Sequence, residues 1–448
     1  MVTQPPLDRE AELDALEDRV REALQRAEKA GAGAAEAQAQ LSRGLSVNVR
    51  MGEVETLEHM QDRGISVTVL IGRRKGQASS ADLRPETIAA CVDRALDIAR
   101  YTEEDPCNGL ADPDRLAVGA PDLDLWHPSP VDAEAAIERA LACEAAGRAE
   151  PRISNSEGAA FNAGLGLSVY GNSNGFVGRS SGTNYSQSCV LLAGRGDGMQ
   201  RDYSYDSRRC LADLEPVEVT GAEAARRTVG RLGARPLPTR AVPVLFAPRV
   251  ATGLISHLLR AISGSTLIRN ASFLKDRAGE QILPDWFRVA ERPHLLRGVS
   301  SSHFDNEGVA TAERDVIDAG VLTGYVLSTY TARRLGLQTT GNAGGARNLL
   351  VSPGGDGEGD LLASVNDGFY VTEVMGQGVN LVTGDYSRGA SGYRIVDGRL
   401  DHPVEEVTVA GNLADMFSDI AGAGEDVDTR GNIHCGGLLI RRMMVAGL

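Results

Sequence analysis

The sequence is poor in aromatic residues, in positive charge and in long apolar runs. Phe, Trp and Tyr make up only 4% of its 448 residues, which argues against base-stacking platforms for nucleic acid. The formal net charge is −15, whereas phosphate contacts need a basic face, so direct DNA binding is not expected. No apolar run approaches membrane-spanning length, and the Pro-rich, then acidic beginning is not typical of a signal peptide. We therefore expect a protein that binds neither nucleic acid nor membranes.

Cysteine is scarce as well, and the six cysteines form no Cys-x-x-Cys pair. In a chain of this size without an export signal, this pattern indicates reduced thiols and a cytoplasmic location rather than a disulfide framework. The sequence also lacks a Gly-x-Ser-x-Gly word, a Ser/His/Asp order and a phosphate-binding loop, so no familiar hydrolase or nucleotide site is predicted.

Hydrophobic periodicity predicts an α/β arrangement in the first half of the chain. Asp8 is a predicted cap for a helix in which Leu13, Leu16 and Val20 share one face. Alternating apolar residues predict two strands, at 45–51 and 65–71. The remaining predictions are a helix from Pro85, a helix opened by Ser129-Pro130, strands over 153–210 with a hairpin turn at Asn174-Gly175, and a helix over about 221–232.

A linker at Pro236–Thr239 marks the predicted domain boundary. We expect an N-terminal α/β domain over residues 1–235 and a C-terminal β-rich domain over 240–448. In the second domain the pattern predicts a strand at 242–246, one short helix containing Leu254 to Ile262, and hairpins such as 316–327. The predicted fold class is therefore α+β, and its second domain is strand-rich.

Glycine is concentrated with polar residues in the last third of the chain, at 340–348, 375–380 and 383–392. Such segments could hold an extended peptide by its main chain, or they could be tight bends in a curved sheet, and glycine content alone favours bends. The residues predicted to face a substrate or a partner are Gly376, Gln377, Gly378, Asn380, Asp385, Ser387 and Arg388.

Several longer words carry a resemblance to a known family. They are Ala95–Tyr101 followed by Glu104–Cys107, Ile262–Gly264, Phe304–Gly308 and Pro403–Leu413. With these words in this order, the chain resembles the TldD/TldE (PmbA) family nearly end to end, and in particular its TldE/PmbA branch. The resemblance implies an α/β part followed by a β-rich part with curved, mainly antiparallel sheets. It also implies a cytoplasmic, heterodimeric metallopeptidase that acts on unfolded peptides, including microcin precursors and antitoxins in some species. The family's older label is "modulator of DNA gyrase", but the acidic composition counts against direct DNA binding.

The resemblance also implies where a metal would lie. The metal-bearing TldD branch carries a His-Glu-x-x-x-His word before the glycine that corresponds to Gly264. Aligned on Gly264, these three positions are Ile255, Ser256 and Arg260, which supply neither imidazole nor carboxylate. His257 is two places out of register, and we interpret it as a surface or packed residue. We therefore predict no metal ligand and no catalytic residue in this chain.

Two further candidates have simpler interpretations. Cys435 falls near the place of a ligand in the metal-bearing branch, but without a histidine pair we interpret it as a buried thiol. Glu53, Glu55 and Glu58 near His59 fit the wet face of a strand, and the acidic 356–360 segment fails the spacing of a calcium loop.

These observations predict a TldE/PmbA-type subunit that lines a closed chamber, with a TldD-type partner supplying zinc, its ligands and the general base. No cofactor is expected in this chain, and the predicted ligands are unfolded peptides. Two alternatives stay open: a peptide-binding or chaperone-like module without a peptidase role, and an independent hydrolase with an unrecognised site.

Overall fold

The computed structural model describes residues 7–119, 121–354 and 358–447, so residues 356 and 357 of the acidic segment lie outside it. Its helices are α1 (Arg9–Lys29), α2 (Pro85–Tyr101), α3 (Ala133–Arg148), α4 (Val217–Gly230), α5 (Pro248–Ala261), α6 (Gly264–Leu267), α7 (Thr329–Leu335), α8 (Glu358–Ala363) and α9 (Leu413–Ser418). The strands of the first half are β1 (Ala34–Arg50), β2 (Glu53–Ile71), β3 (Arg74–Ser80), β4 (Ile153–Asn172), β5 (Val177–Ala193) and β6 (Gln200–Arg208).

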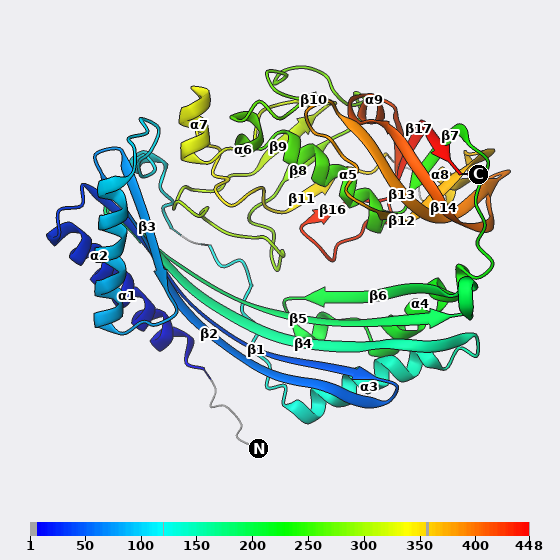
Figure 1. Ribbon diagram of the computed structural model, residues 1–448, viewed down its shortest axis with the longest axis horizontal. Helices are drawn as coiled ribbons and strands as arrows, with labels where there is room; N and C mark the ends of the chain where they lie inside the picture. The colour runs from blue at the N-terminus through cyan, green and yellow to red at the C-terminus, as the bar shows by residue number, and fades with distance from the viewer. Residues whose placement is uncertain (1–6, 120, 355–357, 448) are drawn as a thin grey trace.

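The strands of the second half are short, apart from β12 to β14 and β17. They are β7 (Arg240–Phe246), β8 (Val289–Glu291), β9 (Arg314–Asp318), β10 (Val321–Leu322), β11 (Leu349–Val351), β12 (Asp367–Met375), β13 (Asp385–Val396), β14 (Arg399–Asn412), β15 (Ile420–Ala423), β16 (Ile433–His434) and β17 (Leu438–Ala446). The α+β fold class with curved, mainly antiparallel sheets is confirmed (Figure 1).

One six-stranded antiparallel sheet dominates the first half, with the order β3-β2-β1-β4-β5-β6. The odd-numbered apolar residues of β1 are buried along its whole length, from Ala35 to Val49. Because side chains alternate between faces, this pattern puts all helices of the first half on one side of the sheet. Figure 1 shows α1 and α2 at one end of that side and α3 and α4 at the other.

Two separate cores lie on this side. The first joins α1 and α2 to the sheet through residues such as Leu16, Ile88 and Val67. The second joins α3 and α4 to the other end through Ala140, Phe161 and Ala224. The long strands connect the two cores into one body.

Helices α3 and α4 cross closely because glycine lies at the contact. A Cβ built on Gly221 of α4 would lie 2.1 Å from the carbonyl oxygen of Cys143 in α3. Two helix boundaries differ from the sequence-based expectation. Helix α3 begins at Ala133 rather than at Ser129-Pro130, because Asp132 accepts a hydrogen bond from the Ala135 amide. Helix α4 begins at Val217, directly after Pro216, and ends at Gly230.

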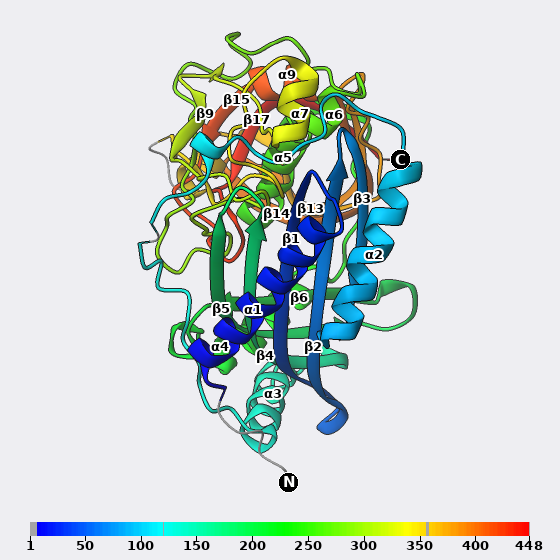
Figure 2. The same ribbon diagram turned by 90° about the vertical axis from the view of Figure 1, so that its left-hand side faces the viewer.

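The other face of the large sheet is polar, and none of the described helices covers it. On β1 this face presents Gln38, Gln40, Ser42 and Asn48, all exposed. The sheet curves so that this face turns toward the C-terminal half, as Figures 1 and 2 show. The fold thus places a wide polar concave surface opposite the strand-rich half.

A closed strand arrangement forms the core of the second half. Its order is β14-β13-β12-β7-β17, and β14 pairs with β17 to close it, while β15 extends from β17. The closing pair joins Thr408–Ala410 of β14 to Met444–Ala446 of β17. A five-stranded sheet, β10-β9-β8-β11-β16, lies beside it. Among the described residues, no helix is long and apolar enough to cross a membrane.

Candidate functional site

Helix α5 contains Ile255, Ser256 and Arg260, the three positions that the resemblance aligns with a metal-binding motif. Pro248 occupies its first turn, and its apolar residues at helical spacing pack into the core of the second half. The sequence predicted only a short helix here, whereas α5 runs over 14 residues. Its C-terminal end leads into the Ile262–Gly264 word, where the amide of Gly264 donates to the carbonyl of Val326.

The residues present on α5 do not fit a metal ion. Ile255 is 1% exposed and packs in the core, and the Ser256 hydroxyl donates to the carbonyl of Thr252. Arg260 is an exposed cation at the end of the helix. In the part of the chain that the structure describes, no three His, Cys, Asp or Glu side chains are grouped so that they could hold a metal ion. No catalytic step is therefore assigned to a metal held by this chain.

Cys435 is buried, as expected. Its thiol is fully inaccessible and lies 3.2 Å from the carbonyl oxygen of Gly436. Burial raises the pKa of this thiol to about 12, so the thiolate that would bind a metal is disfavoured.

His257 is a packed residue beneath β13. Its ring lies edge-on to the Tyr386 ring, with 6.0 Å between the centroids, and its Nδ1 is buried without a hydrogen-bond partner among the described residues. Burial first, and then the Arg388 and Arg260 cations, lower the pKa of His257 to about 4. Burial likewise raises the pKa of Tyr386 to about 12. Both side chains are therefore neutral at pH 7.

This neutral histidine predicts an acid sensitivity. The unfolded chain has an ordinary histidine pKa of about 6.5, so between pH 6.5 and 4 it binds more protons than the folded chain. The contribution of His257 to stability is therefore complete above pH 6.5 and falls as the pH drops through that window. We expect wild type to lose about 2 kcal/mol more unfolding free energy than His257→Gln between pH 8 and pH 5. Urea unfolding at both pH values measures the difference, and equal losses would contradict the assignment.

The predicted binding residues lie together on the loop between β12 and β13 and on the start of β13. Gly376, Gln377, Gly378, Asn380, Asp385 and Ser387 are exposed, while Arg388 is half-buried. Arg388 lies on the same strand as Tyr386 and lowers the pKa of His257, so this cluster borders α5. The fold thus brings the glycine-rich β12–β13 loop and helix α5, both singled out from the sequence, side by side.

Many polar groups of this loop form hydrogen bonds within the loop. The amide of Ser387 donates to the Gly378 carbonyl at 2.7 Å, and a Cβ on Gly378 would lie 1.9 Å from the Ser387 oxygen. The Asp385 carboxylate accepts from the Thr383 hydroxyl at 2.6 Å. Arg388 makes long hydrogen bonds to the carbonyls of Met375 and Val374. The loop is a tight hairpin with an exposed rim, and its role toward a substrate or partner stays a prediction.

The glycine word at 340–348 is an internal bend. Asn342 donates to the buried Glu291 carboxylate at 2.7 Å and accepts from Arg314 at 3.0 Å. The buried Asp305 accepts from the amides of Glu307, Val309 and Ala343. The Phe304–Gly308 motif, which carries part of the family resemblance, and the glycine-rich segment 340–348 are therefore hydrogen-bonded to each other and shape the fold.

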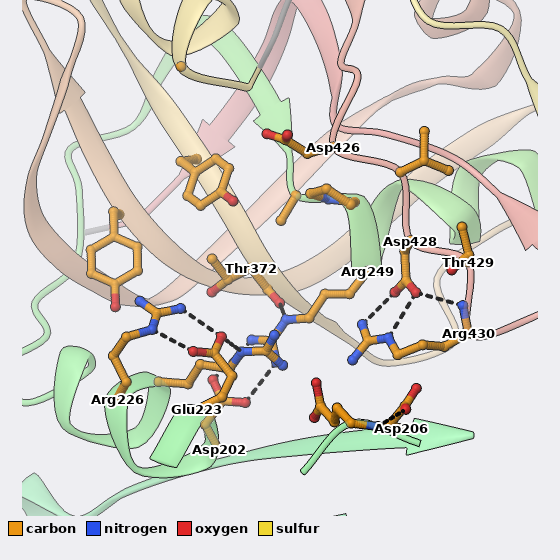
Figure 3. Close-up of a pocket in the computed structure, with 18 of the residues that line it drawn as sticks. Asp202, Asp206, Glu223, Arg226, Arg249, Thr372, Asp426, Asp428, Thr429 and Arg430 are labelled. Atoms are coloured by element: carbon orange, nitrogen blue, oxygen red, sulfur yellow. Dashed lines mark hydrogen bonds and ion pairs between the residues drawn. The ribbon is translucent and has the colours of Figure 1, made fainter. Parts of the chain in front are cut away.

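A cavity of 910 Å³ lies between β6 and α4 on one side and the strand-rich half on the other (Figure 3). Asp202 on β6 lines this cavity and forms an ion pair with Arg249. Both terminal nitrogens of Arg249 lie 2.9 Å from the carboxylate oxygens of Asp202. Arg249 also donates to the carbonyl of Thr372 on β12. Above β6, Arg430 pairs with Asp428 at 2.5 Å and stacks over the Tyr205 ring.

The charges lining this cavity compensate one another. Each lining arginine pairs with a carboxylate: Arg208 with Asp206, Arg226 and Arg227 with Glu223, Arg249 with Asp202, and Arg430 with Asp428. Burial alone would raise the pKa of Asp202, but the hydrogen bonds and charge of Arg249 hold it below its usual value. Arg249 and Arg430 thus link β6 to the strand-rich half, and the paired residues around this cavity are called the clamp below. No Ser, Cys or Lys is among the described residues that line the cavity.

Sequence reasoning missed this clamp. The available signal was the alternation of Asp202, Ser204 and Asp206 with Tyr203 and Tyr205, which places two carboxylates on the mostly buried face of one strand. Buried carboxylates require cationic or hydrogen-bonding partners, but Arg249, the partner of Asp202, lies 47 residues away in the chain.

Comparison with known proteins identifies the family. Models of PmbA/TldA metallopeptidase domain 1, its central domain and its C-terminal domain match residues 35–99, 126–232 and 239–447. The chain belongs to the TldD/TldE (PmbA) family. It is 48% identical over 440 residues to metalloprotease PmbA of Escherichia coli O157:H7, covering 98% of this chain and 97% of that one. It is 45% identical over 427 residues to the metalloprotease PmbA homolog of Haemophilus influenzae, covering 95% and 94%.

Solved structures of the family share the fold. A putative modulator of DNA gyrase from Bacteroides thetaiotaomicron aligns with a TM-score of 0.92 at 29% identity, covering 96% of this chain and 99% of that one. TldE from Thermococcus kodakarensis aligns with a TM-score of 0.84 at 20% identity, covering 97% and 100%. The resemblance drawn from the sequence words is thus confirmed for the TldD/TldE (PmbA) family.

Proposed function

We propose that this chain is the TldE/PmbA-type subunit of a cytoplasmic, heterodimeric metallopeptidase that degrades or processes unfolded peptides. A TldD-type partner would carry the zinc, its ligands and the general base. The observation that carries the proposal is the packing of α5, where Ile255 fills the core and Arg260 presents a cation at positions that hold histidines in the metal-bearing branch.

The polar concave face of the large sheet supports a chamber role. This face turns toward the strand-rich half and exposes side chains such as Gln38, Gln40 and Asn48. Amide and hydroxyl groups can bond an extended main chain without selecting one sequence. The same surface would also suit a peptide-binding module without peptidase activity, which the experiment below separates from the subunit role.

The first expected result is that the purified chain holds no stoichiometric transition metal. Elemental analysis after dialysis against zinc measures this, with Cys435→Ala as the matched control. About one zinc per chain, lost in Cys435→Ala, would contradict the assignment.

The second expected result is a complex with the TldD-type subunit. An obligate pair of this size should bury more than about 2,000 Å² in total. Native mass spectrometry of the co-expressed chains should show a heterodimer at micromolar concentration. Two separate species would favour the binding-module alternative.

A further inference from the structure

The large sheet has two edges, which differ in whether their outward main-chain hydrogen-bonding groups are already occupied. On β6, Arg227 donates to the carbonyl of Tyr203 at 3.1 Å, and Arg430 donates to the carbonyl of Tyr205 at 3.0 Å. These guanidinium groups occupy acceptors that an incoming strand would need.

The opposite edge is open over its first half. Strand β3 pairs with β2 only from Ile65 to Ile71. Among the described residues, no strand pairs with the outer edge of β2 over residues 53–62, and every side chain from Glu53 to Arg63 is exposed. The sequence predicted one solvent-exposed strand face carrying Glu53, Glu55 and Glu58, whereas both faces of β2 are solvent-exposed here. This stretch contains no Pro and no Lys, the residues that commonly guard a free edge.

The apolar stripe under α3 continues uncovered onto this edge. Val47 and Val49 of β1 are fully buried, while their β2 neighbours Leu57 and Val54 are each 43% exposed. Met60, opposite Gly44 on the concave face, is 45% exposed. The buried core beneath α3 and α4 therefore ends at β1 and does not extend to residues 53–62 of β2. Apolar side chains are consequently solvent-exposed on both faces of β2.

The charge of this edge indicates what would cover it. Residues 53–63 carry four carboxylates, on Glu53, Glu55, Glu58 and Asp62, against one arginine, Arg63. A second copy of the chain would bring the same excess of carboxylates to the joint. A strand with basic and apolar side chains would complement it.

We infer that the edge of β2 over residues 53–62 is where the metal-bearing subunit docks, by adding an edge strand of net positive charge to this sheet. The inference rests on the proposed function, because it names the surface that holds the proposed pair together. Main-chain hydrogen bonds would supply the pairing, Leu57 and Met60 would be covered on their two faces, and the carboxylates would select a basic strand.

The test uses the full-length chain and the metal-bearing subunit. Leu57→Lys/Met60→Lys places two cations on the edge, and Leu337→Lys/Met444→Lys is the matched control because these side chains are 48% and 44% exposed elsewhere. Equal thermal midpoints of the isolated variants establish that both fold. We expect the edge variant to raise the Kd of the pair at least about 100-fold and the control to change it by less than about threefold.

Hydrogen exchange provides the second measurement. The amides of residues 53–62 that point outward should exchange freely in the isolated chain and become protected in the pair. Affinity should also fall as salt is raised, because the joint is charged. Protection by a generic unfolded peptide alone, or a homodimer of wild type lost in the edge variant, would overturn the assigned occupant.

The outcomes separate the two proposals. A wild-type pair whose Kd is unchanged by the edge substitutions, with residues 53–62 still exchanging freely, overturns this inference and leaves the proposed function standing. Absence of a wild-type pair overturns the proposed function, and the inference with it.

Discussion

Replacing Arg249 by methionine is expected to lower the free energy of unfolding by about 3–5 kcal/mol at pH 7. The substitution leaves the Asp202 carboxylate, which is 4% exposed, without its two 2.9 Å bonds. The remaining cation, Arg231, lies 3.7 Å from Asp202 and also pairs with Glu373. A buried charge that loses its partner retains its full desolvation cost, which is why the expected effect is large.

Two further variants make the result specific to the clamp. Asp202→Asn/Arg249→Met should be more stable than Arg249→Met alone, because it removes the uncompensated charge. Arg201→Met lies on the same strand but breaks an exposed pair with Glu157, so it should change stability by less than about 0.5 kcal/mol. Urea unfolding measures all three. A similar loss in Arg201→Met and Arg249→Met would contradict the role of the clamp.

The elements that sequence reasoning found are those fixed by local pattern. Helix α1 begins after Asp8, whose carboxylate accepts from the Ala11 amide, and it buries Leu13, Leu16 and Val20 as predicted. The hairpin at Asn174-Gly175 is present, with Gly175 at φ 90°. Caps, helical spacing and turn glycines act over a few residues, so they can be recognised in a single sequence.

Strand length was underestimated because burial there depends on distant elements. The predicted strands at 45–51 and 65–71 are the ends of β1 and β2, which start at Ala34 and Glu53. The first half of β1 alternates small alanines that α1 and α2 cover, and the first half of β2 is not covered by any of the described residues. Neither segment therefore shows the strong alternation of large apolar and polar residues by which a strand is recognised in a sequence.

In the candidate site too, sequence reasoning found the features that depend on local pattern and missed those that depend on distant contacts. The positions on α5 that the resemblance aligns with a metal-binding motif could be located because Gly264 belongs to a recognisable sequence motif. The clamp could not, because Asp202 and Arg249 lie 47 residues apart and meet only when the halves of the chain pack together. The exposed edge of β2 was also missed as a docking surface, since its free neighbours become visible only in the sheet order.

The second large effect is expected in catalysis by the pair. If this chain completes the chamber, the metal-bearing subunit alone should cleave an unfolded peptide at least about 100-fold more slowly than the pair. The gain would come from holding the extended substrate in register by main-chain hydrogen bonds and from excluding folded proteins. A folded substrate should therefore resist cleavage until it is unfolded.

Variants on the β12–β13 loop refine this expectation. Asp385→Ala removes the acceptor of the Thr383 hydroxyl, and Arg388→Ala removes the half-buried cation beside His257. Each should slow the pair about tenfold without changing its metal content, provided that the pair assembles. His257→Gln should leave turnover at pH 7 unchanged, because the ring is buried and neutral there.

The most direct test of the central claim is peptide turnover by the zinc-loaded partner with and without this chain, at equal partner concentration and with the metal content of both samples measured. The account predicts slow cleavage by the partner alone, recovery of the rate on titration to one equivalent of this chain, and zinc that stays with the partner. Equal rates with and without this chain, or zinc that stays with this chain, would contradict the account.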